Sequence, residues 1–292
     1  GNEFRLIIRG LKRVKVRLNG ETTEESLTEC DDNHFIQMAD RVKRSGFINF
    51  FGEQRVGSAG TSELVGVRAF DIGRAMLQGD FSKAIESMMS GRNSDDSRES
   101  DAAKKVRQTW QDTSGDPAAT LKAFHGADNI LSRERMVLKG LNRYGKDHPL
   151  EAIRCLSHSV RTFWINAYQS YIWNQVASAR IQRHGKKPIK GDLYQDVDSE
   201  EVKVLNSEDS TVSISQVVLP LPGFNIRYPE NDIADLYTEL LRNDAVTFEK
   251  AALAESSAKG GYRRLVVHPM MLTSEMILSD AVQLSFQLPK GC

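Results

Sequence analysis

The chain has 292 residues, of which 40% are hydrophobic and 27% charged, and its formal net charge is zero. This is enough apolar sequence for one or two domains with a sizeable core, and a neutral total leaves the class of partner open. No apolar run approaches the ~20 residues that span a bilayer, and the first residues lack the apolar region of a signal peptide, so we expect neither membrane insertion nor secretion.

The cysteines and histidines are scattered and show none of the CxxC, HxxxH or HxH spacings of the usual metal sites. Three widely spaced cysteines, Cys30, Cys155 and Cys292, argue against a disulfide framework and favour a reducing intracellular compartment. We therefore expect no metal site.

The charge is uneven along the chain. Between Phe4 and Gly20 there are six basic residues and no acid, which are Arg5, Arg9, Lys12, Arg13, Lys15 and Arg17. A local field of this kind can attract a polyanion although the total charge is zero. The alternative interpretation is an ordinary strand face in contact with solvent.

The first sixty residues are predicted to form strands around one helix. The apolar run Phe4–Ile8 and the alternation over 14–18 predict two strands, and Asn19-Gly20 predicts a turn that leads into a loop over 21–32. Apolar spacing over 35–43 predicts a helix that ends at Gly46, and FINFF at 47–51 predicts a further strand.

The middle of the chain is predicted to be mainly helical. The helices are expected over 61–89 with a break at Gly79-Asp80, and over 102–113, 117–125, 131–144 and 159–183. Tyr and Trp residues widen the apolar face of the last of these, and we interpret them as core. Ser90–Asp101 contains no hydrophobic residue and is predicted to be a linker.

The last third is predicted to return to strands, over 212–221, 265–267 and 282–288, with helices over 232–241 and 246–257. Strands at both ends of a helical middle indicate an α+β fold. They also suggest that residues 90–260 are inserted into a sheet domain made of 1–89 and 261–292.

The segment Phe47–Gly57, FINFFGEQRVG, is the most informative part of the chain. Aromatic rings beside amide and guanidinium donors suit a nucleobase that has left its stack, because rings stack on its face and an amide reads its edge. A buried strand followed by a turn is the alternative, and the residues alone leave both open.

This segment resembles the NYFGEQRFG motif of the TruD-type pseudouridine synthases, with Phe50 in place of the usual Tyr and Val56 in place of the usual Phe. Further matches follow in the family's order: GNEFRLIIRG at 1–10, IGRA at 72–75, Arg161 with YQSYIWN at 168–174, LPLPG at 219–223 with Tyr228-Pro229, GYRR at 261–264 with Pro269, and FQLPKG at 286–291. The YQS helix and LPLPG resemble the eukaryotic branch more than the bacterial one.

The resemblance implies a pseudouridine synthase α+β catalytic domain, a mixed or antiparallel sheet with helices, that carries a large and mostly helical TruD insertion domain. Residues 1–89 and 261–292 would form the catalytic domain, and 90–260 the insertion. The implied reaction isomerises uridine to pseudouridine in tRNA or other RNAs without cofactor or metal. The resemblance further implies a monomer that acts in the nucleus or cytoplasm and does not bind membranes.

The chain departs from the family at its catalytic residue. The family's catalytic aspartate lies in a segment like GTKDKRAVTxQ, and no such segment occurs here. None of Asp31, Asp32, Asp40, Asp71 and Asp80 has the Thr-Lys-Asp context, so the role is assigned to none of them. We expect the chain to be part of a longer enzyme, without the nucleophilic Asp and the extreme C-terminus, and inactive by itself.

The family's site residues are carried over one by one. Asn49 would lie beside the aspartate, Phe51 would line the uridine pocket, and Gln54 and Arg55 would support that loop or the phosphates. RNA contacts would come from Lys12, Arg13, Lys15, Arg17, Arg161, Gln169, Arg263 and Arg264, although the last four could equally fix the insertion in place. A second basic group, expected to face phosphates, comprises Arg180, Arg183, Lys186, Lys187 and Lys190.

One alternative function remains open, a non-catalytic RNA-binding module made of the TruD-like region only. The residues encoded before Gly1 distinguish the two hypotheses, because a GTKD-like segment there would support an enzyme.

Overall fold

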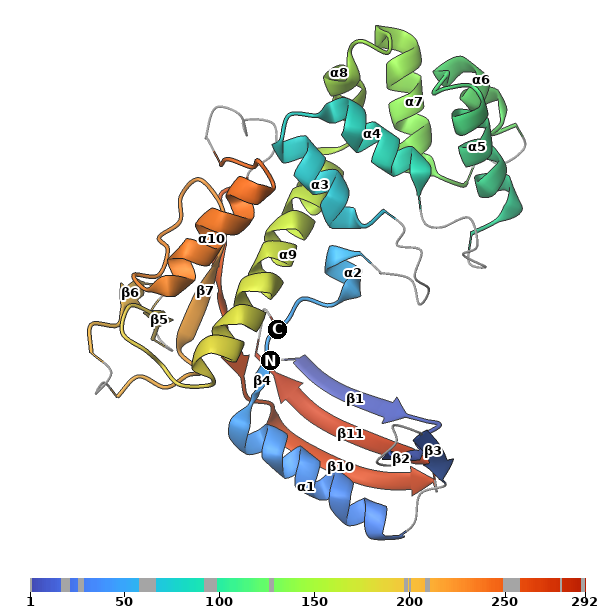
Figure 1. The fold of residues 1–292 in the computed structure, drawn as a ribbon. Helices are drawn as coiled ribbons and strands as arrows, with labels where there is room; N and C mark the ends of the chain where they lie inside the picture. Colours follow the sequence, from blue (N-terminus) through green and yellow to red (C-terminus); the bar gives the residue numbers. More distant parts are fainter. Residues whose placement is uncertain are drawn as a thin grey trace. The chain divides into compact units, whose positions relative to one another are not determined.

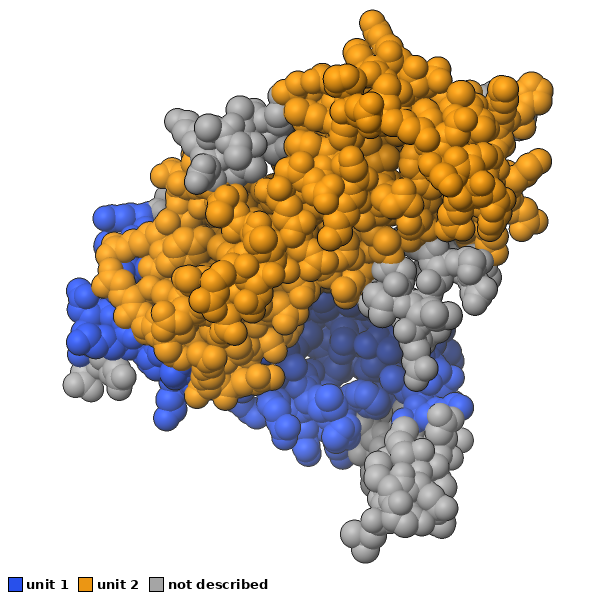
Figure 2. Space-filling view, turned by 45° about the horizontal axis from the view of Figure 1, so that its top comes forward, with its two compact units in different colours: residues 1–49, 184–218, 263–292 blue, residues 50–183, 219–262 orange. Residues whose placement is uncertain are grey.

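The computed structural model of the chain describes residues 2–16, 22–25, 29–57, 67–91, 99–125, 129–196, 199, 201–207, 211–248, 258–278, 280–289 and 292. The chain forms two compact units, which are coloured separately in Figure 2. Unit 1 comprises Gly1–Asn49, His184–Val218 and Arg263–Cys292, and unit 2 comprises Phe50–Arg183 and Leu219–Tyr262. Each unit therefore combines segments that are far apart in the sequence.

Unit 1 contains a three-stranded antiparallel sheet with the order β1-β11-β10 (Figure 1). Its strands are β1 (Asn2–Ile8), β11 (Ala281–Leu288) and β10 (Met270–Leu278). The register between β1 and β11 is unbroken, and the Phe4 and Phe286 rings stack across it with centroids 5.4 Å apart. Helix α1 (Glu29–Ser45) packs along β10.

The edge strand β1 exposes consecutive apolar side chains. Leu6, Ile7 and Ile8 are 46%, 44% and 43% exposed. Because successive side chains of a strand point to opposite faces, apolar groups are exposed on both faces of this edge. An apolar edge of this kind is a place where a further strand can pair.

The remaining strands form short ladders. They are the pair β2 (Arg13–Val16) and β3 (Thr22–Glu25), the pair β4 (Phe47–Ile48) and β9 (Val266–Val267), and a four-stranded sheet of β6 (Val202–Val204), β5 (Leu193–Gln195), β7 (Val217–Leu221) and β8 (Gly261–Arg264) in that order. The boundary between the two units falls within β7 and β8.

Gly46 turns the chain from α1 into β4. Its φ of 62° is one that L side chains rarely adopt, and a Cβ there would lie 2.6 Å from Val266 Cγ1. The Lys186 ammonium donates to the carbonyls of Ser45 (2.9 Å) and Gly46 (2.8 Å), which satisfies acceptors left open at the helix end. This turn sets the direction of β4, and so of Asn49 immediately after it.

Unit 2 is mainly helical, and its long helix α9 (His158–His184) runs beside α3 (Figure 1). The other helices are α2 (Glu53–Val56), α3 (Ala69–Leu77), α4 (Phe81–Ser90), α5 (Asp101–Asp112), α6 (Pro117–Lys122), α7 (Ser132–Tyr144), α8 (Pro149–Arg154) and α10 (Asp232–Asn243). Trp164, Tyr168 and Trp173 of α9 are buried, which confirms that its aromatic face belongs to the core.

Gly73 allows α3 to approach the backbone of α9. A Cβ on Gly73 would lie 2.0 Å from the Trp164 carbonyl oxygen and 2.6 Å from its carbonyl carbon. Real Cβ atoms do not come so close, and backbone atoms cannot move aside as a flexible side chain can. The IGRA segment therefore requires glycine at this crossing of two helices.

A polar network at Asp244 ties α9 to α3 and to the end of α10. The Tyr168 hydroxyl donates to Asp244 Oδ2 (2.9 Å), and Arg74 donates to Asp244 Oδ1 (3.0 Å) and to Asp71 Oδ1 (2.9 Å). Burial raises the pKa of Tyr168 above its ordinary value of 10.0, and the charge and hydrogen bond of Asp244 raise it further. The neutral phenol is therefore the form that the fold requires.

The predicted helices over 102–113, 117–125, 131–144, 159–183 and 232–241 are confirmed within a few residues, as is the break at Gly79-Asp80, where the Asp80 carboxylate caps α4. The predicted strands over 4–8 and 282–288 are also confirmed. The turn at 19–20, most of the helix expected over 246–257 and the centre of the linker over 90–101 lie outside the described residues.

Two local predictions are wrong. The expected loop over 21–32 contains β3 and the start of α1, and the expected strand over 47–51 pairs only at Phe47–Ile48. The ladder between β4 and β9 has only two residue pairs. Beyond it, the N–H and carbonyl of Phe51 hydrogen-bond to the Asn174 side chain instead of to a neighbouring strand. Strands β5, β6, β8 and β10 and helices α2 and α8 had no sequence-based prediction.

We expect Gly73→Ala to destabilise the protein by about 2–3 kcal/mol, because the added methyl forces α3 away from α9. Urea denaturation measures the change. Gly52→Ala is the matched control, since nothing lies within 4 Å of a Cβ at Gly52. Equal urea midpoints for Gly73→Ala and the unmodified protein would contradict the close-packing argument.

The Tyr168 pKa predicts a pH dependence. Its raised value in the folded state means that its contribution to stability is complete below pH 10 and declines as the pH rises further, because the unfolded chain then loses the phenolic proton first. Tyr168→Phe should lower the free energy of unfolding at neutral pH by about 1 kcal/mol and make it fall less steeply above pH 10. Thermal unfolding at a series of alkaline pH values measures both, and an unchanged alkaline slope would refute the assignment.

Candidate functional site

Asn49 is held in unit 1 by two neighbouring strands. It directly follows β4, is 3% exposed, and its backbone N–H donates to the Leu265 carbonyl (3.0 Å). Arg263 of β8 donates from Nε to the Asn49 carbonyl (2.7 Å) and from Nη2 to Asn49 Oδ1 (2.7 Å). One guanidinium therefore fixes both the backbone and the side chain of this residue.

The Arg263 contact also determines the orientation of the Asn49 amide. Arginine has donors only, so the amide atom that faces it must be the oxygen. The Asn49 Nδ2 group is then a donor whose direction is set, and none of the described residues accepts a hydrogen bond from it. Asn49 thus presents a preoriented NH2 group to a partner that accepts hydrogen bonds.

Phe51 is held in unit 2 by the side chain of Asn174 in α9. The Phe51 N–H donates to Asn174 Oδ1 (2.9 Å), and Asn174 Nδ2 donates to the Phe51 carbonyl (2.9 Å). This bidentate pairing imitates the two hydrogen bonds of a neighbouring strand. It fixes the backbone of Phe51, and so the starting point of its side chain.

Trp173 orients the aromatic side chains of the same segment. The Phe51 and Phe50 rings lie edge-on to Trp173, with centroids 5.7 and 6.5 Å away. The indole N–H of Trp173 donates to the Leu219 carbonyl (3.1 Å), which fixes the indole in turn. The Phe51 ring is half-buried, whereas Phe50 is 44% exposed.

Other side chains of α9 support the same region. The Arg55 Nε group lies 3.4 Å from Ser170 Oγ, and Gln169 donates to the Pro222 carbonyl (2.6 Å). The helix therefore positions two segments at once, the FGEQR segment at 51–55 and the LPLPG turn at 219–223. Gln54 lies on α2 with its side chain exposed.

Four of the eight proposed RNA contacts, Arg161, Gln169, Arg263 and Arg264, hydrogen-bond to other parts of the chain. Arg161 donates to the Arg154 and Leu156 carbonyls at the end of α8 (3.0 and 2.8 Å), and Arg264 donates to the Ser215 carbonyl (2.7 Å). Gln169 is only 4% exposed. Lys12 is exposed, the side chains of Arg13 and Lys15 are not described, and Arg17 lies outside the described residues. Their role toward RNA stays a prediction.

The second basic group does not form one phosphate-facing surface. Arg180 is fully buried, so the expectation for it is wrong. Arg183 pairs with Asp232 (3.0 Å), and Lys186 caps α1. A run of cations on and after a helix predicts a charged surface, but burial and tertiary partners decide where each cation lies.

Sequence reasoning did not assign functions to Ser170, Trp173 and Asn174, although all three belong to the YQSYIWN segment that carries the resemblance. Their spacing of three and four residues places them on one face of α9, and this was the available signal. The Asn49–Arg263 pairing joins residues 214 positions apart and has no local signal.

No group of three or more His, Cys, Asp or Glu side chains that could hold a metal ion occurs among the described residues. In that same part of the chain, no helix has the length and apolar character needed to cross a membrane.

The chain matches known proteins along its whole length. A family model described as tRNA pseudouridine synthase D (TruD) matches residues 1–292. The pseudouridylate synthase 7 homolog of Bos taurus is 31% identical over 85% of this chain, and the mouse pseudouridylate synthase PUS7L is 32% identical over 96%. The probable tRNA pseudouridine synthase D of Methanopyrus kandleri is 28% identical over 84% of the chain.

The chain spans 36% and 38% of the length of the bovine and mouse relatives. A crystal structure of the putative tRNA pseudouridine synthase D from Methanosarcina mazei aligns with all of this chain and 66% of its own, with a TM-score of 0.73 and 23% identity. This likeness confirms the predicted α+β fold, and the eukaryotic relatives confirm the predicted branch. The chain therefore belongs to the TruD family of pseudouridine synthases.

Proposed function

We propose that the whole protein is an RNA pseudouridine synthase that isomerises uridine to pseudouridine in tRNA or other RNAs, and that this chain supplies one wall of the uridine pocket. The observation that carries the proposal is the fixed Asn49 amide, which lies in the family's motif with its NH2 group available to donate. The names of the relatives support the same reaction.

The proposed reaction breaks the bond between the ribose and N1 of uracil, turns the base, and rejoins it through C5. The proton lost from C5 balances the proton gained at N1, so the isomerisation needs no cofactor, metal or second substrate. A catalytic aspartate from another part of the whole protein would act at the ribose or base. The exposed apolar edge of β1 supports a whole protein in which further strands extend this sheet.

Asn49 and Phe51 would have separate roles in this pocket. The Asn49 N–H would donate to the catalytic carboxylate or to a uracil carbonyl, and its geometry would be set in advance by Arg263. The Phe51 ring would lie against the flipped base. Arg55 would support the loop through Ser170, and Gln54 would lie at its edge.

Several further properties belong to this proposal. Residues 1–89 and 261–292 would serve as the catalytic domain and 90–260 as the insertion. The protein would act as a monomer inside the cell, in the nucleus or cytoplasm, on tRNA or other RNA, and without a metal or membrane partner. The alternative, a non-catalytic RNA-binding module, would bind RNA without producing pseudouridine.

We expect Asn49→Asp in the whole protein to lower the single-turnover rate of pseudouridine formation about 10²-fold. The carboxylate keeps both acceptors for Arg263 but replaces the N–H donor, so the urea midpoint should not fall. Asn49→Ala should lose the same activity and also some stability, because Arg263 then loses an acceptor. Full activity in Asn49→Asp would rule out the donor role.

Asn174 provides a second test, of positioning. Asn174→Ala leaves the Phe51 N–H and carbonyl without partners, which should cost about 1–3 kcal/mol of stability and lower the turnover rate about tenfold. Ser170→Ala is the matched control on the same helix face. It removes the 3.4 Å contact with Arg55 and a hydrogen bond to the Asn166 carbonyl within α9, and it leaves both hydrogen bonds to Phe51 in place. Unchanged turnover in Asn174→Ala would show that the backbone position of Phe51 does not matter for the reaction.

A further inference from the structure

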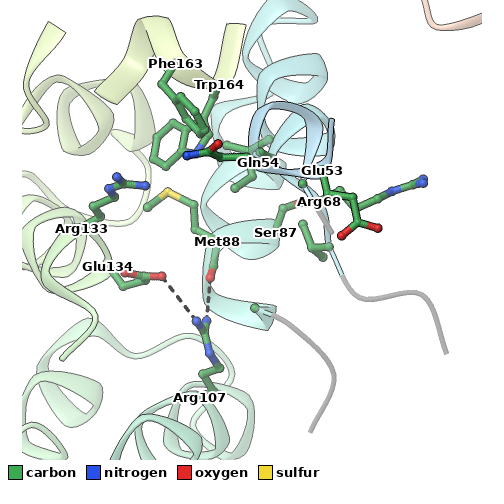
Figure 3. A pocket seen from close by; sticks show the side chains of 15 residues that line it. Glu53, Gln54, Arg68, Ser87, Met88, Arg107, Arg133, Glu134, Phe163 and Trp164 are labelled. Carbon is green, nitrogen blue, oxygen red and sulfur yellow. Dashed lines mark hydrogen bonds and ion pairs between the residues drawn. The ribbon is translucent and has the colours of Figure 1, made fainter. Parts of the chain in front are cut away.

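An open cavity of about 510 Å³ lies within unit 2 (Figure 3). Its wall includes Gln54 of α2, Arg68 before α3, Met88 of α4, Arg133 of α7, and Phe163 and Trp164 of α9. Its volume falls within the ~300–1,000 Å³ of small-molecule sites, a range that admits one nucleotide. Phe51 does not line it, so this cavity differs from the proposed uridine site.

Two arginines of the wall have capacity for a ligand. Arg133 is exposed, and no described residue accepts a hydrogen bond from it or pairs with it. The guanidinium of Arg68 lies 4.2 Å above the Phe70 ring, and its Nε is buried without a hydrogen-bond partner. The Asp71 carboxylate forms an ion pair with this Nε at 3.6 Å, a distance too long for a hydrogen bond, so the Nε–H group still lacks an acceptor.

The acidic side chains of the wall do not cancel this charge. Glu134 pairs with Arg107 (3.4 Å), which also binds Glu99 (2.7 Å) and donates to the carbonyls of Met88 and Met89 (2.7 and 2.8 Å). Figure 3 shows Arg107 held between Glu134 and the Met88 carbonyl. Arg107 and Glu134 therefore serve the fold. The other charged side chains of the wall are Arg68, Arg133 and Glu53, an excess of one cation.

Between these cations lie groups that suit a base. Figure 3 shows the Gln54 side chain reaching toward Phe163 and Trp164, with Arg133 on one side and Arg68 on the other. The Gln54 amide has no hydrogen-bond partner among the described residues, and the Phe163 ring is half-buried. An aromatic ring and a free amide between two guanidinium groups match a base between its two flanking phosphates.

We propose that this cavity binds an unpaired RNA nucleotide other than the one that reacts. Its base lies against Phe163 and is read by Gln54, and the flanking phosphates lie near Arg133 and Arg68. This inference rests on the proposed function, because RNA must be the substrate for such a site to be used. It assigns Gln54 to a neighbouring nucleotide and leaves Asn49 and Phe51 to the target uridine.

The test uses the whole protein and two probes, a fluorescein-labelled oligouridylate and an abasic ribose-phosphate oligomer of the same length. Arg133→Ala should weaken binding of both probes roughly fivefold to tenfold, and lower the salt slope by about one, because a phosphate contact is lost. Arg143→Ala, another exposed arginine of α7 outside the cavity, should change neither.

The base contact is tested separately. Phe163→Leu should weaken binding of the oligouridylate about fivefold or more and leave the abasic oligomer unaffected, since only stacking is lost. Gln54→Ala should act in the same direction, and it avoids any disturbance of α9. Equal affinities of Arg133→Ala and Arg143→Ala, or equal effects of Phe163→Leu and Gln54→Ala on both probes, would overturn the inference.

A parallel assay separates this inference from the proposed function. Pseudouridine is measured in total tRNA after incubation with the unmodified whole protein. Absence of product would sink the enzymatic proposal, whereas the two-probe comparison would still decide whether the cavity binds a nucleotide.

Discussion

The amide of Asn174 does for Phe51 what a neighbouring strand would do elsewhere. The ladder between β4 and β9 ends after two residue pairs, and the chain must still be held where the FGEQR segment begins. Asn174 uses both its donor and its acceptor for this, at 2.9 Å each. Ser170 and Trp173 act from the same face of α9, so the position of the segment depends on the position of this helix. The close contact at Gly73 then becomes a requirement of the site as well as of the core.

The Asn49–Arg263 pair shows why the same motif also needs a distant arginine. An amide is ambiguous, because either end can face a partner, and a buried amide with no fixed partner can turn. A guanidinium removes this freedom, since it only donates and its two parallel N–H groups reach both Asn49 oxygens. Lysine would supply charge without the fork. The GYRR segment therefore contributes to the candidate site through what it does to Asn49.

Local signals in the sequence were sufficient for the family and for the longer helices of unit 2, though not for the short helices α2 and α8. Helix formation there depends on features within a few residues of each other. These are the spacing of apolar residues, the Asp80 carboxylate that caps α4, and the proline at the start of α6. The same reasoning failed where tertiary contacts decide. The run FINFF has the composition of a five-residue strand, but only its first two residues find a partner strand. Strand β10 was not predicted because Thr273, Ser274 and Glu275 interrupt its apolar pattern. The residue-by-residue resemblance placed Asn49 and Phe51 in the motif, but only the structure showed which atoms hold them.

An enzyme that acts on a base must first take it out of its stack, which costs a few kcal/mol. The target nucleotide cannot supply all of this energy, because contacts made equally in the ground and transition states do not accelerate the reaction. Binding energy from neighbouring nucleotides, which do not react, can instead be used to hold the target base out of its stack. The cavity beside α2 is suited to such a contact, because the segment that carries Phe51 also carries Gln54. Holding a neighbouring nucleotide at Gln54 would then help to hold the target at Phe51, three residues away on the same fixed backbone.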